Sequence, residues 1–289
     1  MEKRGKVAII GAKGLVGGAL VEVLSESYEV IPLDREELDV TVYGTVKRLF
    51  KDLMPQIVIN AAGYSDVDAC ERRTQLAFSV NAEGAKNVAK ASSLVKAKVV
   101  YISSDYIFDG KKETPYKEED QPNPLNVYGE SKLLGERYVQ EHSDDYLILR
   151  TQWLFGPHGR NFVDTILSLA DQGKGRMEVV EDLIGSPTYT IDLAQVIVEL
   201  LKRDTWGIYH VSNSGQCSWY EFAKEILKQI GKNEIEVVPI LSADLTRPAR
   251  RPIFSVLSKE KLEKELGIKI RPWQEALSDY LKRRGFKIS

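Results

Sequence analysis

The 289-residue chain is long enough for one large α/β domain, or for a large and a small one with separate cores. A net charge of -2 provides no basic excess for phosphates, so we expect no nucleic-acid partner. No apolar run approaches the ~20 residues that span a bilayer, and the N-terminus leads into a short strand rather than a signal-peptide core. Two distant cysteines suit a reducing compartment, so we expect a cytoplasmic protein with no membrane partner.

The first predicted element is a short strand over residues 6–10 that ends in a glycine turn. A helical pattern follows the turn, which consists of Gly11, Ala12, Lys13, Gly14, Leu15, Val16 and Gly17. Between a strand and a helix, such glycines allow the backbone to approach a pyrophosphate at the helix N-terminus. We interpret the turn as a dinucleotide-phosphate site rather than as a glycine-rich surface loop.

A second strand, residues 28–33, ends at Asp34, about 20 residues beyond the central glycine, where an acid suits the hydroxyls of an adenosine ribose. Arg35 and Lys13 could instead hold a 2'-phosphate, so these residues leave NADH and NADPH open as cofactors. Asp39 and Val40 follow in the next loop. They could hold an adenine edge, although a helix N-cap is the commoner use of such an aspartate.

Two later strands deliver small and polar residues to the same edge of the sheet. The strand at 56–60 is followed by Ala61, Ala62 and Gly63, and the strand at 98–102 by Ser103, Ser104, Asp105 and Tyr106. Small residues let a ligand approach, and a strand-end hydroxyl can hydrogen-bond a substrate carbonyl. Asn81 lies in an amphipathic helix predicted over residues 77–91. A ligand contact and an ordinary polar position explain Asn81 equally well.

Tyr128 and Lys132 are four residues apart in a helix predicted to begin near residue 127. Side chains at this spacing share a helix face, and a neighbouring cation favours the phenolate, so the pair can exchange a proton. The same spacing recurs by chance at Tyr43 with Lys47 and at Tyr220 with Lys224. Tyr128 differs from both because a strand-end hydroxyl and a dinucleotide-binding turn precede it.

The strand–helix alternation is regular up to about residue 150 and weaker beyond it. We expect residues 1–155 to form a doubly wound, Rossmann-like parallel sheet that carries the dinucleotide site and the Ser/Tyr/Lys group. Residues 156–289 are expected to be mainly a smaller substrate-binding region. This region is discontinuous because a strand near 207–211 is predicted to return to the main sheet. Helices are expected at 161–172, 190–201, 218–230, 258–266 and 272–284.

Three arginines, Arg247, Arg250 and Arg251, lie among prolines in a loop-like stretch. Guanidinium groups match the geometry of a diphosphate, which favours a contact with a nucleotide sugar or with another subunit. The alternative is a solvated basic loop.

In this order, the glycine turn, the Asn-Ala-Ala segment, the strand-end serine and Tyr-x-x-x-Lys resemble the extended short-chain dehydrogenase/reductase family. Longer stretches resemble its dTDP-4-dehydrorhamnose reductase branch, and this resemblance extends over nearly the whole chain. These stretches are residues 33–40, 60–68, 103–110, 124–129, 149–153, 185–188 and 247–252. Asp105 and Tyr106 stand where the related dehydratases carry Asp-Glu, which argues against a dehydratase.

The resemblance implies an NADH- or NADPH-dependent reductase of a nucleotide-linked 4-keto-6-deoxysugar, with dTDP-4-dehydrorhamnose and dTDP-rhamnose as substrate and product. Tyr128 would be the general acid, Lys132 would hold the nicotinamide ribose and lower the tyrosine's pKa, and Ser104 would align the sugar carbonyl. The substrate side would also include Asp105, Tyr106, Trp153 and Arg251. An aromatic residue that caps the core edge explains Trp153 equally well from sequence alone.

Two other functions remain open. Some relatives are non-catalytic regulatory subunits of methionine adenosyltransferase, and others reduce or epimerise different nucleotide sugars. The resemblance also leaves a homodimer open, and some members use Mg²⁺ at a dimer interface. No spacing of ligands here supports Mg²⁺ or a structural metal, so we assign no metal-binding residue.

Overall fold

The computed structural model describes residues 3–173 and 175–288, and its centre is a six-stranded parallel sheet. The strands are β1 (Lys6–Ile10), β2 (Glu29–Leu33), β3 (Ile57–Asn60), β4 (Lys98–Ser104), β5 (Tyr146–Thr151) and β10 (Gly207–His210). They follow the order β10-β5-β4-β3-β1-β2, and every neighbouring pair is parallel. The predicted doubly wound α/β fold is therefore confirmed. The order changes direction between β1 and β3, where open parallel sheets bind ligands at the strands' carboxyl ends.

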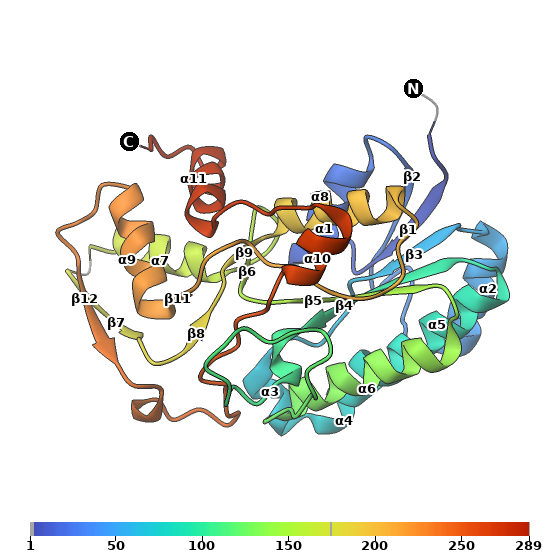
Figure 1. The fold of residues 1–289 in the computed structure, drawn as a ribbon, viewed down its shortest axis with the longest axis horizontal. Helices are drawn as coiled ribbons and strands as arrows, with labels where there is room; N and C mark the ends of the chain where they lie inside the picture. The colour runs from blue at the N-terminus through green and yellow to red at the C-terminus, as the bar shows by residue number, and fades with distance from the viewer. Residues whose placement is uncertain (1–2, 174, 289) are drawn as a thin grey trace.

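Helices cover both faces of this sheet (Figure 1). One face carries α1 (Leu15–Leu24) and α8 (Thr190–Lys202), and the other carries α2 (Tyr43–Leu53), α5 (Gly84–Leu94) and α6 (Val127–His142). Val7 and Ile9 of β1 belong to the core beneath α1 and α8, whereas Ala8 and Ile10 belong to the core beneath α2 and α5. The inner part of β1 is apolar at every position because its side chains are buried on both faces of the sheet.

The helix predicted over residues 77–91 is longer and interrupted. It comprises α4 (Thr74–Phe78), a π-helical turn η1 (Ser79–Glu83) and α5. Asn81 lies in the π-turn, and its carbonyl accepts a hydrogen bond of 3.0 Å from the Tyr101 hydroxyl. A π-turn widens the helix by one residue without altering the run of apolar residues enough to be recognised. The helices α2 and α3 (Val67–Arg72) are not among the predicted elements.

The second half of the chain builds a second core and also completes the first. The second core contains Phe155, Phe222 and Tyr280, and Figure 1 shows its elements grouped at the end of the molecule away from α2. They are α7 (Phe162–Asp171), α9 (Trp219–Gln229), α11 (Trp273–Arg283) and the parallel pair β7 (Arg176–Val180) and β12 (Glu236–Ile240). By contrast, β10 pairs with β5 and α8 packs against α1 in the main sheet.

The remaining elements are short. They are the strand pairs β6 (Leu154–Phe155) with β9 (Thr188–Tyr189) and β8 (Ile184–Gly185) with β11 (Cys217–Ser218), the 3-10 turns η2 (Asp105–Ile107) and η3 (Ser242–Asp244), and α10 (Glu260–Leu266). Across the described ranges, no helix combines the length and apolar character that crossing a membrane requires.

We expect that α6 can pack closely against β4 only because residue 135 is a glycine. A Cβ at this position would press against the Tyr101 hydroxyl and the Asn81 carbonyl, and the carbonyl belongs to the backbone and cannot move aside. We expect Gly135→Ala to lower the free energy of unfolding by about 1–3 kcal/mol, as overpacked cores do. Gly44 in α2 is the matched control, since a Cβ there meets nothing within 4 Å. Gly44→Ala should be neutral or stabilise by up to about 1 kcal/mol in urea titrations, and equal effects would contradict the packing argument.

Candidate active site

Two cavities meet at the glycine turn that follows β1. One, of about 470 Å³, extends over the end of β2, and the other, of about 400 Å³, extends over the ends of β4 and α6. Gly14, Ala61, Ala62 and Gly63 line both cavities. An elongated ligand that occupied both would therefore cross the turn at the switch point of the sheet.

The turn has the geometry of a phosphate cradle. Gly11 has φ +79°, and a Cβ there would lie 2.9 Å from the Ala62 nitrogen. A Cβ on Gly17 would collide with the Gly11 carbonyl, so Gly17 supports the turn from behind rather than lining a cavity. Within the described chain, α1 has no side-chain cap at Gly14 and no acid in its first turn. Its first N–H groups and the positive end of the helix dipole are thus available to an anion.

The cavity of about 470 Å³ brings together the residues predicted to bind an adenosine. Its lining includes Gly11, Lys13, Asp34, Arg35, Asp39 and Val40. The Lys13 ammonium contacts the Asp34 carboxylate. Hydrogen bonds with Glu37 and then with Lys13 hold the pKa of Asp34 below its ordinary value. Asp39 accepts hydrogen bonds from the backbone and hydroxyl of Thr41, at 2.9 and 2.7 Å, which fixes the loop around Val40.

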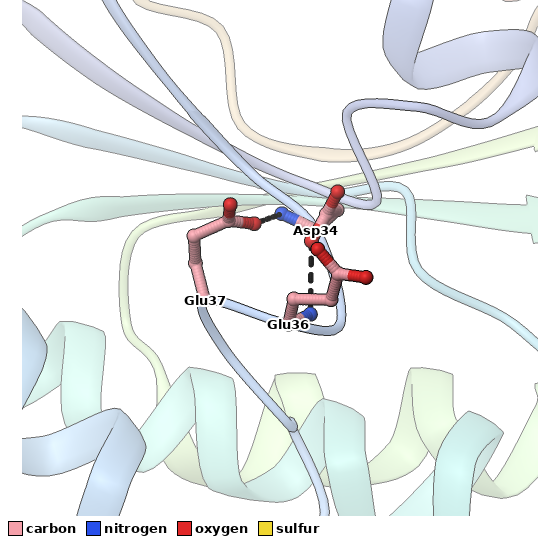
Figure 2. A group of neighbouring side chains, drawn as sticks. All are labelled: Asp34, Glu36 and Glu37. Carbon is pink, nitrogen blue, oxygen red and sulfur yellow. Dashed lines mark hydrogen bonds between the residues drawn. The ribbon is translucent and has the colours of Figure 1, made fainter.

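Asp34, Glu36 and Glu37 are close enough for their carboxylates to share a cation (Figure 2). The carboxylates already have donors, however. Glu37 accepts from the Asp34 nitrogen at 3.0 Å, and Asp34 accepts from the Glu36 nitrogen at 2.8 Å and contacts Lys13. We interpret this cluster as an ordered loop that presents Asp34, and we assign no metal to it.

The predicted catalytic residues share the cavity of about 400 Å³. Ser104 is the last residue of β4, and Tyr128 and Lys132 lie on one face of α6. Asn126 caps α6 by accepting a hydrogen bond from the Gly129 nitrogen at 2.8 Å. The cap fixes the first turn of α6, where Tyr128 lies.

Burial dominates the electrostatics of Tyr128 and Lys132. The Lys132 ammonium donates to the Ile102 carbonyl at 2.6 Å and lies 4.1 Å from the centre of the Tyr101 ring. Burial lowers the pKa of Lys132 to about 7, against the opposing effect of Glu136. Loss of solvent around the phenol raises the pKa of Tyr128, and the neighbouring Ser104 hydroxyl works against that rise. That Lys132 lowers the tyrosine's pKa stays a prediction.

Three buried polar atoms in this cavity have no hydrogen-bond partner within the described chain. They are Asp105 Oδ2, Thr151 Oγ1 and Gln152 Nε2, and all three residues line the cavity. A buried polar group without a partner is costly and usually marks a position that a polar ligand or water satisfies. Thr151 and Gln152 were not predicted as site residues.

Trp153 lines the cavity in a strained conformation. Its φ of +45° is rare for a residue with a side chain, and it is held by stacking on Trp219, with ring centroids 3.7 Å apart. Gly185 makes room, because a Cβ there would collide with the Trp153 indole. Trp219 also lines the cavity but was not predicted, since it lies at the start of α9 with no motif around it.

Besides Gly17, two predicted ligand contacts lie outside both smaller cavities. Asn81 is buried and uses its amide to accept from the Tyr64 nitrogen at 2.7 Å and to donate to Ser131 Oγ at 2.9 Å. It therefore supports the loop behind Gly63. Arg251 pairs bidentately with Asp68, at 2.7 and 2.6 Å, and lines a third cavity of about 910 Å³.

A glycine cradle at the switch point of a parallel sheet, with a serine, a tyrosine and a lysine around the adjoining cavity, defines a Rossmann-type enzyme of the short-chain dehydrogenase/reductase class. A family model, RmlD substrate binding domain, matches residues 5–285. Relatives at more than 30% identity extend over nearly the full chain. The chain therefore belongs to the dTDP-4-dehydrorhamnose reductase family.

Three comparisons illustrate this similarity. The spore coat polysaccharide biosynthesis protein SpsK of Bacillus subtilis (strain 168) is 42% identical, over 96% of this chain and 98% of its own length. The dTDP-4-dehydrorhamnose reductase of Aggregatibacter actinomycetemcomitans is 38% identical, over 95% and 97%. The crystal structure of dTDP-4-dehydrorhamnose reductase from Bacillus anthracis str. Ames in complex with NADP has a TM-score of 0.94 and 40% identity, and the match covers 98% of this chain and all of that one.

Burial of Lys132 should lower the free energy of unfolding of the protein at neutral pH. Because its pKa falls from 10.5 to about 7 in the fold, the unfolded chain holds more protons between these pH values, and stability rises with pH across that window. Lys132→Met should therefore stabilise the protein at pH 6–7, by roughly 1–4 kcal/mol, with the gain shrinking towards pH 10. Thermal unfolding at several pH values measures this.

The control for that measurement is Lys224→Met. Lys224 has the same spacing to Tyr220, 5.1 Å from its ring, but is exposed on α9. We expect no pH-dependent gain from Lys224→Met. If both variants gained the same stability, the effect of Lys132→Met could not be assigned to the burial of the Lys132 ammonium, and the prediction would be wrong.

Proposed function

We propose that the protein reduces the C4 carbonyl of a nucleotide-linked 4-keto-6-deoxysugar with NADPH or NADH. The most specific form of the proposal is conversion of dTDP-4-dehydrorhamnose to dTDP-rhamnose, the reaction for which several relatives are named. The observation that carries it is one cavity that joins the Ser104, Tyr128 and Lys132 group to unpartnered polar atoms, directly beside a phosphate cradle. Reduction of a carbonyl needs this combination of a proton donor, an oxygen-binding hydroxyl and a dinucleotide site.

In this proposal the dinucleotide lies across the glycine turn. The N–H groups of Leu15 and Val16 at the start of α1 face its phosphates, and Asp34 with Lys13 and Arg35 faces the adenosine ribose. The crystal structure of the Bacillus anthracis relative in complex with NADP supports a dinucleotide of this kind as the cofactor. When bound, the nicotinamide supplies the hydride.

The protein's own residues handle the proton. Tyr128 donates its phenolic proton to the carbonyl oxygen, and Ser104 hydrogen-bonds the same oxygen, so that negative charge never accumulates on it. Lys132 holds the nicotinamide ribose from the base of the cavity. Its pKa near 7 allows it to gain or lose a proton close to neutrality and so to reprotonate the tyrosine through the ribose hydroxyls.

The sugar fits the remaining walls of the cavity. Thr151, Gln152 and Asp105 offer polar atoms that sugar hydroxyls would satisfy. The stacked indoles of Trp153 and Trp219 offer an apolar wall, and carbohydrate C–H groups together with a C6 methyl group suit such a wall.

The nucleotide end would enter the cavity of about 910 Å³. Arg247, Arg250 and Arg251 line it together with apolar residues such as Phe254 and Ile184. Arg251 is also close enough to Tyr106 to oppose the rise in the pKa of that phenol, which burial causes. Arg251 thus lies between the two cavities, where a diphosphate joins sugar to nucleoside. We therefore assign residues 1–155 to the dinucleotide and the chemistry, and most of 156–289 to the substrate.

Tyr128→Phe tests the reaction. With dTDP-4-dehydrorhamnose and NADPH or NADH, the variant should lose about 10²–10⁴-fold in kcat and keep its affinity for the dinucleotide, because only the transferred proton is removed. Tyr220→Phe, at the chance repeat of the motif, should match the wild type. Undiminished turnover by Tyr128→Phe would contradict the role of Tyr128 as proton donor. A wild-type protein that binds the dinucleotide but reduces no nucleotide sugar would indicate a regulatory subunit.

Arg251→Ala tests the placement of the diphosphate. Losing a charged hydrogen-bond donor should raise KM for the nucleotide sugar about 10- to 100-fold and leave KM for the dinucleotide unchanged. Arg176→Ala, on an exposed position of β7, should change neither value. Steady-state kinetics with each substrate varied in turn separates the two sites, and a rise confined to the dinucleotide KM would contradict the assignment.

A further inference from the structure

Asp105 is a buried carboxyl within the Tyr128 cavity that the proposed chemistry leaves without a proton role. It is 2% exposed, and its Oδ1 lies 3.0 Å from Ser104 Oγ. Its Oδ2 has no hydrogen-bond partner among the described residues. A buried carboxylate with an unsatisfied oxygen is costly, so this setting favours the neutral carboxylic acid.

The Ser104 hydroxyl is contacted on three sides. It accepts a hydrogen bond from the Tyr106 nitrogen at 3.2 Å, it donates one to Asp105 Oδ1 at 3.0 Å, and it lies near enough to the Tyr128 phenol to lower the pKa of that group. A serine hydroxyl carries a single proton to donate. That proton can point towards Asp105 or towards Tyr128 and the substrate oxygen beside it, but not towards both at once.

We propose that Asp105 is a positioning residue whose protonation sets the direction of the Ser104 hydroxyl proton. A neutral Asp105 donates its own proton to Ser104 Oγ, which leaves the Ser104 proton free for the carbonyl oxygen. An ionised Asp105 accepts the Ser104 proton and withdraws it from the reaction. Asp105 keeps its proton through turnover, so the proton that enters the product still comes from Tyr128. The inference rests on the proposed function.

The balance between the two states lies near neutrality. Burial raises the pKa of Asp105 to about 7, and the neighbouring Ser255 and Ser104 hydroxyls act in the opposite direction. The carboxyl is neutral below that value and ionised above it. The productive orientation of Ser104 is therefore present at lower pH and lost as pH rises through about 7.

The surrounding groups leave one competing explanation for such a loss. Burial raises the pKa values of the Tyr106 and Tyr128 phenols, and that of Cys70 to about 11, while Arg251 stays charged. Lys132 on α6 is different, because burial lowers its pKa to about 7. A pH profile of the wild type alone cannot separate Asp105 from Lys132.

Asp105→Asn separates them, since asparagine is neutral at every pH and its amide can donate to Ser104 Oγ. Because Asp105 also lines the sugar cavity, the two proteins are compared by the shape of their kcat–pH profiles, each normalised to its own value at pH 6. Between pH 7 and 9 the wild type should fall up to about tenfold per pH unit for each group that loses its proton, whereas D105N should lose the part of this decline that Asp105 causes and fall less steeply. The proposal is overturned if D105N keeps the wild-type decline, which then belongs to Lys132, or if D105N is already inactive at pH 6.

A measurement without substrate makes the test independent of the reaction. Infrared difference spectra of the full chain between pH 6 and 8.5 should show the C=O band of a buried carboxylic acid that disappears at high pH and is missing in D105N. D109N is the matched control, because hydrogen bonds keep the pKa of Asp109 below its ordinary value, so this variant should retain the band. Absence of the band in the wild type at pH 6 would overturn the proposal even if the protein reduces its sugar. Its presence in a protein that reduces no nucleotide sugar would count against the proposed function alone.

Discussion

The position of α6 depends on one buried ion pair. Glu136 of α6 accepts from Arg150 of β5 at 2.8 Å and from Ser103 of β4 at 2.5 Å, and all three residues are almost fully buried. Such a pair adds little net stability compared with apolar packing, but removing one partner leaves a buried charge. Its geometry also permits few alternatives. The pair therefore fixes the rotation and register of α6, and with them the point at which Tyr128 and Lys132 face the end of β4.

Close packing at two glycines also holds α6 against its neighbours. A Cβ on Gly129 would collide with the Tyr106 carbonyl, and one on Gly135 would press against Tyr101 and the Asn81 carbonyl. Two glycines, six residues apart, thus let α6 approach both η2 and β4. This close approach excludes water from Lys132 and Asp105, which is why burial is the largest influence on the pKa of each. Titration near neutrality is a consequence of how tightly the helix is held.

The sequence was sufficient for those parts of the structure that short-range rules determine. The predicted ends of α7, α9 and α11 lie within one residue of the observed ends, because caps and apolar periodicity mark them locally. The residues of the glycine turn, the strand-end serine and the tyrosine–lysine pair gather at one edge because parallel strands end on the same side. The resemblance to a known family supplied the expectation that Trp153 lies against the sugar, whereas the chemistry of guanidinium groups already indicated a ligand or subunit contact for Arg251.

Contacts between segments that are distant in the sequence could not be predicted from such short-range rules. Trp219 reaches the cavity only because the second core places α9 beside Trp153, and nothing near Trp219 in the chain signals this. The support that Asn81 gives to Tyr64 depends on a π-turn that apolar spacing does not reveal. The competition for the Ser104 proton likewise needs the distances around it. Residue types identified the participants, whereas their hydrogen-bond partners required the fold.

The site combines several features that each oppose folding. Lys132 is buried, and its ammonium contacts the Ile102 carbonyl and the face of the Tyr101 ring. Asp105 has a carboxyl oxygen without a hydrogen-bond partner among the described residues, and Trp153 adopts a left-handed backbone conformation. Left-handed strain alone costs of order 1–3 kcal/mol. The main sheet offsets these costs elsewhere, since its strands are apolar on both faces and covered by helices throughout. Because α6 is anchored to that sheet by Glu136, the unfavourable groups cannot relax without disturbing the core, and the cavity keeps the geometry that carbonyl reduction needs.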